Sequence, residues 1–206
     1  MNRISLFAAL LGLTLSQASC QTPAAEKLAP NLDYRGPTNA VVLIIRHAEK
    51  PESGFDLTPA GHIRAAAYVG YFKEFQIDSQ PLKLDYLFAA TDSDNSHRPR
   101  LTIEPLSHAT GIKIDTRFTD KAPIGLAEEL HARDHGRQIL VSWRHSGIPK
   151  LIAALGVDPL KLLPAPRWPE DVFDWVIVLR FDQDGKVIPS ECKRINEKLM
   201  FGDSKN

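Results

Sequence analysis

Arginine and histidine side chains follow three apolar segments of the sequence, at the points where each segment ends. Arg46 and His47 come directly after Val41–Ile45. Arg98 lies in a polar stretch after a second apolar segment, and His145 lies shortly after a third. Short apolar runs of this kind are typical of strands buried on both faces of a parallel sheet. The carboxyl ends of such strands meet at one edge, where ligands bind, so we expect the four side chains to converge.

Two arginines and two histidines in one place have a defined chemistry. They repel one another unless an anion lies between them, and phosphate suits that position because a guanidinium donates to two of its oxygens at once. A neutral imidazole among them is a competent nucleophile toward phosphorus. Phosphoryl transfer needs little beyond a positioned nucleophile and a positive field. The pattern therefore predicts a phosphate site with no metal and no other cofactor. The plainer interpretation, polar residues that merely end strands, is weakened because the pattern recurs.

The elements that must position these residues alternate along the chain. Thr58 and Pro59 are expected to be the N-cap and first residue of a helix that buries Ile63 on its apolar side. A hairpin is expected over residues 175–188, because Asp184-Gly185 separates two apolar segments. Strands are expected at residues 41–45, 84–90, 112–114 and 138–143, and helices at 59–75, 100–109, 126–135 and 148–155. This order predicts an α/β fold, a three-layer sandwich with a mainly parallel central sheet, an antiparallel edge and helices on both faces.

The composition suits one globular domain. The chain has 206 residues, of which 43% are hydrophobic, which is enough for a sizeable core. Its formal net charge is zero, so it carries no electrostatic footprint for nucleic acid. Only Cys20 and Cys192 are present, which excludes a disulfide framework and a cysteine-based metal site.

The N-terminal residues have the features of an export signal. Arg3 precedes the apolar segment Ile4–Leu15, and small residues follow it. This arrangement is typical of a secretory signal peptide, which we place at residues 1–19. Two processing routes stay open, namely cleavage before Ser19 and lipidation of Cys20. The second would attach the mature protein to a membrane.

The chain after the signal peptide divides into two parts. Residues 20–39 are rich in alanine, proline and polar residues and are expected to form a flexible tether. Residues 40–206 are expected to form the functional domain. Either processing route predicts an exported protein, periplasmic or anchored as a lipoprotein.

Four ordered motifs resemble those of the histidine phosphatase superfamily, which includes the phosphoglycerate mutases and acid phosphatases. Arg46–Lys50 is similar to its Arg-His-Gly/Ala-Glu-Lys signature, and Leu57–Ala65 is similar to the segment that follows. Arg98–Leu106 resembles the second arginine motif, and Val141–Pro149 resembles the second histidine motif. A single such motif is weak support, but four in the right order over residues 41–156 are strong.

The resemblance implies a role for each matching residue. His47 would be the nucleophile that forms a phosphohistidine, while Arg46, Arg98 and His145 would complete the phosphate pocket. His145 would thus count among both the catalytic and the phosphate-binding residues. Arg144 departs from the family pattern, in which glycine often precedes the second histidine.

The proton donor to the leaving group is left open between two carboxylates. The segment ending at Asp120 resembles the family stretch that carries the acid, which makes Asp120 the first choice and Glu128 the second. Both could instead be solvated surface carboxylates.

The sequence thus predicts an exported phosphomonoesterase acting on a small-molecule or glycan phosphomonoester. Two alternatives remain, a non-catalytic phosphate-binding relative and a phosphoglycerate mutase-type phosphotransferase, and export argues against the latter. The proline-rich segment Leu163–Pro169 is expected to be an irregular loop that walls the substrate site.

Overall fold

A six-stranded mixed sheet lies at the centre of the computed structural model, which describes residues 37–203. The strand order is β5-β4-β6-β1-β7-β8, with β1, β4, β5 and β6 mutually parallel and β7 antiparallel to its two neighbours. The strands are β1 (Val41–Arg46), β4 (Tyr86–Ala89), β5 (Ile114–Asp115), β6 (Gln138–Trp143), β7 (Trp175–Arg180) and β8 (Lys193–Asn196). This topology confirms the mainly parallel sheet with an antiparallel edge.

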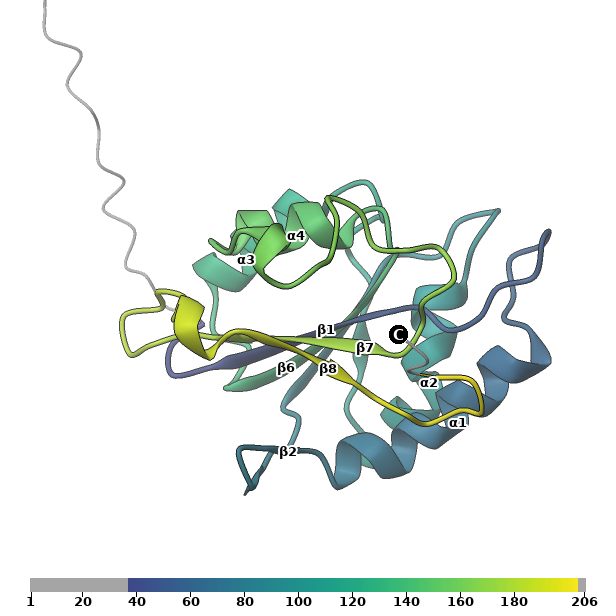
Figure 1. Ribbon diagram of the computed structural model, residues 1–206, viewed down its shortest axis with the longest axis horizontal. Helices are drawn as coiled ribbons and strands as arrows, with labels where there is room; N and C mark the ends of the chain where they lie inside the picture. The colour runs from purple at the N-terminus through teal and green to yellow at the C-terminus, as the bar shows by residue number, and fades with distance from the viewer. Residues whose placement is uncertain (1–36, 204–206) are drawn as a thin grey trace, which may run out of the picture. The chain divides into compact units, whose positions relative to one another are not determined.

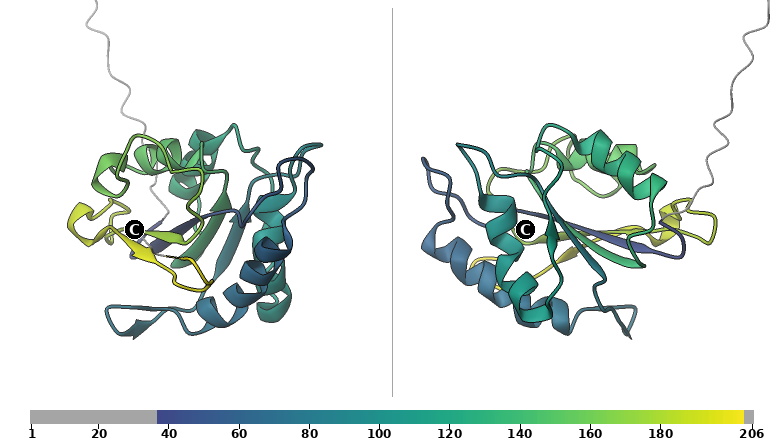
Figure 2. Two further views of the ribbon diagram at one scale, coloured as in Figure 1. Left: turned by 45° about the vertical axis from the view of Figure 1, so that its right-hand side comes forward. Right: turned by 180° about the vertical axis from the view of Figure 1, so that it is seen from behind.

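Helices cover both faces of this sheet, as the three-layer prediction requires. Figure 1 shows α1 and α2 on one face and α3 and α4 on the other, and the two views in Figure 2 agree. The helices are α1 (Pro59–Lys73), α2 (Arg98–Thr110), α3 (Pro123–Ala132) and α4 (Ile148–Ala154), with short 3₁₀ turns η1 (Pro159–Lys161) and η2 (Pro189–Glu191). None of these helices is long and apolar enough to cross a bilayer.

Strand β1 is the central strand that its sequence predicts. Val42 and Ile44 pack into the core beneath α3 and α4, whereas Leu43 and Ile45 pack into the core beneath α1 and α2. All four are fully buried, because the strand lies between β6 and β7 and both of its faces are covered. The end of this strand is therefore a rigid place to hold a reactive side chain.

Helix α1 begins as predicted but buries a different side. The Thr58 hydroxyl accepts the Gly61 N–H at 3.1 Å, and Pro59 is the first helical residue. The prediction that Ile63 is buried is wrong, since 59% of it is exposed and Arg64, at 2%, is buried instead. The spacing of apolar residues in the helix could not predict that Arg64 is buried. The acidic partners that neutralise this arginine include residues far along the chain.

The predicted C-terminal hairpin is only partly correct. Gly185, with φ 72°, forms the expected turn, and its N–H donates to Asp182 O. Beyond it, Val187 makes only an isolated bridge with Phe181, and the strand that pairs with β7 is β8. The turn η2 separates the two segments because Pro189 has no N–H with which to continue a ladder.

Two other parts of the chain bear on the predictions. A two-stranded sheet of β2 (Gln76–Ile77) and β3 (Gln80–Pro81) was not expected. The proposed signal peptide, Cys20 and most of the proposed tether lie outside the described residues.

Candidate active site

His47 directly follows β1 and presents one ring nitrogen as a potential nucleophile. Its backbone N–H donates to Trp143 O at 3.0 Å, which continues the pairing of β1 with β6. The ring Nδ1 lies 2.8 Å from Ala48 O. A carbonyl oxygen only accepts, so Nδ1 carries the proton and Nε2 keeps its lone pair.

The surroundings of His47 hold its imidazole neutral. Burial lowers the pKa of His47 to about 3, the hydrogen bond to Ala48 O opposes this, and the charges of the other pocket residues lower it further. Those residues are Arg46, Arg98 and His145. The structure thus brings together the four side chains that the sequence predicts at one site.

Arg46 is buried with part of its guanidinium unused. Its Nη1 donates to the carbonyl oxygens of Pro169, Glu170 and Val172 at 3.0, 2.7 and 2.9 Å. The guanidinium also lies over the Phe173 ring, 3.9 Å from its centroid. Nε and Nη2 are buried and have no hydrogen-bond partner among the described residues. Burial lowers the pKa of Arg46 to about 10, so it is still a cation at neutral pH.

Arg98, the first residue of α2, is anchored in the same way. Its Nη1 donates to Gly54 O at 2.7 Å and its Nη2 to Asn95 O at 3.1 Å. Nε is buried and unpartnered within the described chain. Burial lowers the pKa of Arg98, and the nearby charge of Arg144 adds to this. Backbone carbonyls therefore fix the side chain without neutralising it.

His145 follows β6 and completes the group. Burial, followed by the charge of Arg46, lowers the pKa of His145 to about 4. Its Nδ1 is buried without a hydrogen-bond partner in the described part of the chain. At neutral pH the pocket therefore holds two charged guanidiniums and two neutral imidazoles.

These side chains leave polar nitrogens without partners around one nucleophile. Buried donors in proteins are almost always hydrogen-bonded, and unsatisfied ones call for an explanation. Arg46 contributes two such nitrogens, and Arg98 and His145 contribute one each. An anion with several oxygens, such as a phosphate monoester, fits them.

Thr102 ties the nucleophile loop to the helix that carries Arg98. Its hydroxyl accepts the Ala48 N–H at 2.9 Å and donates to Arg98 O at 2.7 Å. One side chain therefore sets the spacing between the loop after β1 and the first turn of α2. This contact gives the threonine of the second arginine motif a structural role.

The two candidate proton donors occupy different positions. Asp120 lies beside the loop of the second histidine, since a Cβ on Gly147 would be 3.2 Å from Asp120 O. One of its carboxylate oxygens accepts from Arg144 Nη1 at 2.9 Å. Glu128 is exposed on α3, in a groove that it shares with Lys150. Of the two, Asp120 lies beside the loop that carries His145.

The predicted substrate-site loop does border a pocket beside His145. This pocket has a volume of about 630 Å³ and is lined on one side by residues 165–170. Glu170, which the sequence analysis did not single out, belongs to this lining, and its carboxylate raises the pKa values of both Arg46 and His145. The sequence could not predict that Glu170 lies in this pocket, because the loop before β7 has no regular secondary structure from which to infer its position.

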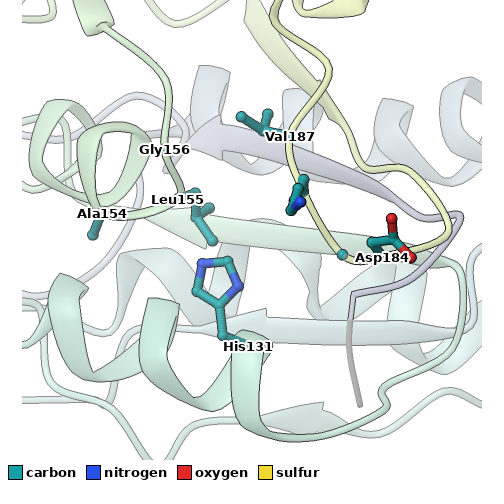
Figure 3. A pocket seen from close by; sticks show the side chains of 8 residues that line it. His131, Ala154, Leu155, Gly156, Asp184 and Val187 are labelled. Atoms are coloured by element: carbon teal, nitrogen blue, oxygen red, sulfur yellow. The ribbon is translucent and has the colours of Figure 1, made fainter. Parts of the chain in front are cut away.

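A separate pocket of about 530 Å³ contains none of these residues. His131, Leu155, Asp184 and Val187 line it, between the ends of α3 and α4 and the turn after β7 (Figure 3). Burial lowers the pKa of His131, and a hydrogen bond to the Ala154 backbone opposes this.

Three solved structures with this fold are named as phosphatases. A candidate phosphohistidine phosphatase, SixA, from Agrobacterium tumefaciens is 18% identical, with a TM-score of 0.51 over 74% of this chain and 96% of that one. A phosphoserine phosphatase mutant from Entamoeba histolytica, in complex with phosphoserine, is 12% identical (TM-score 0.50; 74% and 96% of the two chains). A candidate alpha-ribazole-5'-P phosphatase from Escherichia coli is 13% identical (TM-score 0.50; 79% and 99%). No protein-family model and no curated protein sequence matches the chain.

This chain is an α/β protein by its sheet order and by the helices on both faces of the sheet. The residues at the end of β1 form a candidate phosphate pocket. The solved structures above are members of the histidine phosphatase superfamily, and this chain has the fold of that superfamily.

Proposed function

We propose that this protein is an exported phosphomonoesterase that acts through a phosphohistidine at His47. The observation that carries the proposal is the state of that imidazole. Its Nδ1 donates to Ala48 O, so Nε2 keeps a lone pair, and the lowered pKa keeps the ring neutral beside two cations. A neutral nucleophile in a positive field is what phosphoryl transfer requires.

The proposed reaction has two steps. In the first, Nε2 of His47 attacks phosphorus, the ester P–O bond breaks, and the leaving alcohol takes a proton from a carboxylic acid. In the second, water attacks the phosphohistidine, the P–N bond breaks, and inorganic phosphate leaves while the carboxylate regains the proton from that water. Arg46 and Arg98 stabilise the charge on the transferring group, and His145 adds a hydrogen bond.

We propose Asp120 as the proton donor and Glu128 as the second candidate. Support for Asp120 is its place beside the loop that carries His145. Glu170 is a third carboxylate to test, because it lines the pocket beside His145 in which a leaving group would lie.

The substrate class is a small-molecule or glycan phosphomonoester. Support comes from the pocket of about 630 Å³ next to His145, which is large enough for an organic leaving group. The names of the similar structures include a phosphoserine phosphatase and an alpha-ribazole-5'-P phosphatase, so both of these esters belong in a screen.

A phosphate-release screen of the purified mature domain tests this function. Wild-type protein should hydrolyse at least one ester of a phosphomonoester panel, and His47→Ala should hydrolyse none. Phosphate binding without release by the wild type would favour the non-catalytic alternative. Transfer of phosphate to a second alcohol, with no net release, would favour a mutase-type phosphotransferase.

Export is a separate part of the proposal and rests on residues 1–20. Support is the apolar segment Ile4–Leu15 after Arg3. Palmitate incorporation that depends on Cys20 would establish a lipoprotein. A mature protein that begins at Ser19 would establish a freely periplasmic form, and retention of an uncleaved chain in the cytoplasm would contradict export.

A further inference from the structure

A second buried cluster includes Glu49 of the loop that follows β1, and the proposed reaction does not use it. At its centre is Arg64 of α1, whose side chain is only 2% exposed. Its partners come from the nucleophile loop and from the C-terminal segment. They are Glu49, Glu197 and Asp203.

Arg64 divides its guanidinium between these two parts of the chain. Its Nε and Nη2 donate to the Glu49 carboxylate, with distances from 2.7 to 3.2 Å. Its Nη1 and Nη2 donate to Asp203 at 3.0 and 2.7 Å, and Nη1 also lies 3.3 Å from Glu197. Burial lowers the pKa of Arg64, but the bonds to Asp203 and Glu49 outweigh it, so the pKa is raised.

The C-terminal segment is folded around this arginine. Asp203 Oδ2 accepts the backbone N–H groups of Leu199 and Met200 at 3.0 and 2.8 Å, so the carboxylate that holds Arg64 also closes the turn. Tyr68 donates to Glu197 at 2.9 Å from the neighbouring turn of α1. Residues 197–203 therefore form a defined strap on α1.

Glu49 is also fixed through its backbone. Its carbonyl oxygen accepts the Thr58 N–H at 2.9 Å, and a Cβ on Gly61 would lie 2.5 Å from that oxygen. Only glycine permits this approach of α1 to the loop. Glu49 is two residues from His47, and its charge raises the pKa of Arg46. The position of Glu49 is thus coupled to both the nucleophile and the phosphate pocket.

The charges in the cluster explain why three carboxylates can surround one guanidinium. Burial raises the pKa of Glu197 to about 8, and the charges of Asp174 and Asp203 add to this. The Arg64 charge and the Tyr68 hydrogen bond oppose this rise, and the net raised pKa of Glu197 reduces the negative charge that Arg64 must balance. Glu49 and Asp203 belong to the two parts of the chain that Arg64 connects.

We propose that Arg64 is a positioning residue that connects the C-terminal strap, residues 197–203, to the loop carrying His47. It holds Glu49 and, through it, the backbone that sets the direction of the imidazole. The role in turnover rests on the proposed phosphatase function, whereas the structural coupling does not.

Asp203→Asn is the most informative variant, because Arg64 itself is too buried to remove without risk to folding. It removes one charge from the cluster and keeps the shape of the side chain. Asp85→Asn is a matched control. Asp85 also accepts two backbone N–H groups, those of Arg137 and Gln138 at 2.8 and 3.0 Å, but at the start of β6, away from the pocket.

We expect Asp203→Asn to lower kcat by about tenfold with KM nearly unchanged, because a displaced nucleophile loses rate while Arg46 and Arg98 still bind phosphate. Arg64→Lys should lower kcat further, by about 10²-fold. Lysine keeps the positive charge but lacks the planar guanidinium that donates to two carboxylates at once. Asp85→Asn should leave kcat unchanged at a temperature where both aspartate variants are folded.

A second measurement does not require turnover. In ¹⁵N-labelled protein, the ring nitrogens of His47 and the amides of Ala48 and Glu49 should shift in Asp203→Asn and not in Asp85→Asn. Unchanged resonances at these positions in folded Asp203→Asn would overturn the coupling. Shifted resonances in a protein that hydrolyses no phosphomonoester would support the coupling and reject the proposed function alone.

Discussion

Arg46 and Arg64 are both buried arginines, with exposed fractions of 0% and 2%, but their partners differ. Arg64 meets carboxylates from two parts of the chain. Arg46 meets backbone carbonyls and an aromatic ring, and two of its nitrogens have no partner within the described residues. The pKa of Arg64 is raised despite burial, whereas burial lowers the pKa of Arg46 to about 10.

The difference shows that a buried arginine can either bind a ligand or stabilise the fold, depending on its partners. A buried guanidinium surrounded by carboxylates is neutralised within the protein, and removal of one partner is costly. A buried guanidinium held by carbonyls, with no carboxylate in contact, keeps hydrogen-bond donors that an anionic ligand can use. On this basis the end of β1 is a binding site and the cluster around Arg64 is a support for it.

The largest effect should come from the nucleophile. His47→Ala should reduce phosphate release by at least about 10³-fold on every ester, because no other group of the pocket has a free lone pair in the same place. His62→Ala is the control, since His62 is an exposed residue of α1 that pairs with Asp56. Comparable turnover by His47→Ala and wild type would reject the mechanism.

Removal of the supporting arginine should affect stability as well as turnover. Arg64→Gln should lower the free energy of unfolding by about 3–5 kcal/mol, because it leaves buried carboxylates without their cation. Urea denaturation of Arg64→Gln and Arg46→Gln at pH 7 makes the comparison direct. A loss for Arg46→Gln as large as that for Arg64→Gln would remove the distinction between the two arginines.

Removal of the pocket arginine should mainly affect catalysis and phosphate binding. Arg46→Gln should lower kcat/KM by about 10²–10³-fold, since the transferring phosphoryl group loses a desolvated positive charge. It should also abolish the rise in Tm that inorganic phosphate gives the wild type. The account is contradicted if phosphate still raises the Tm of folded Arg46→Gln by the wild-type amount.

Removal of the proton donor should depend on the leaving group. Asp120→Asn should lower kcat on alkyl phosphates by about 10²-fold and affect p-nitrophenyl phosphate much less, because nitrophenolate leaves without a proton. Glu128→Gln and Glu170→Gln are parallel variants. Equal losses on both substrates in Asp120→Asn would transfer the role to whichever of these shows the leaving-group dependence.

The smallest effect should be seen in pH titration. Burial and the charges of Arg46, Arg98 and His145 lower the pKa of His47 to about 3, against 6.5 for an unperturbed histidine. The unfolded chain therefore binds more protons between these values, and the stability due to neutral His47 is present above pH 6.5 and lost as the pH falls toward 3. The ring resonances of His47 in the free protein should show no titration between pH 8 and 5. A midpoint near 6.5 would indicate a solvated imidazole.

Much of the site could be predicted because it depends on local patterns at strand ends. The apolar run Val41–Ile45 predicted the central strand, and the residues after it predicted the pocket. The helix expected at residues 100–109 is α2, which Gly111 caps with φ 75°.

The supporting cluster could not be predicted, because its partners are far apart in sequence. Arg64 and Asp203 are separated by 139 residues, and no local period indicates that they meet. The prediction that Ile63 is buried failed for this reason, since a charged residue took its place in the interior. Similarly, β8 replaced the expected hairpin partner because η2 interrupts the return of the chain.

The most direct test of the central claim is to trap the covalent intermediate. Wild-type protein is mixed with a ³²P-labelled phosphomonoester that it hydrolyses, quenched within milliseconds in alkali, and analysed by peptide mass spectrometry. We predict an acid-labile, alkali-stable phosphate on the peptide that contains His47, absent from His47→Ala and present in Asp120→Asn. Rapid turnover with no phosphate on His47, or with phosphate on another residue, would contradict the account.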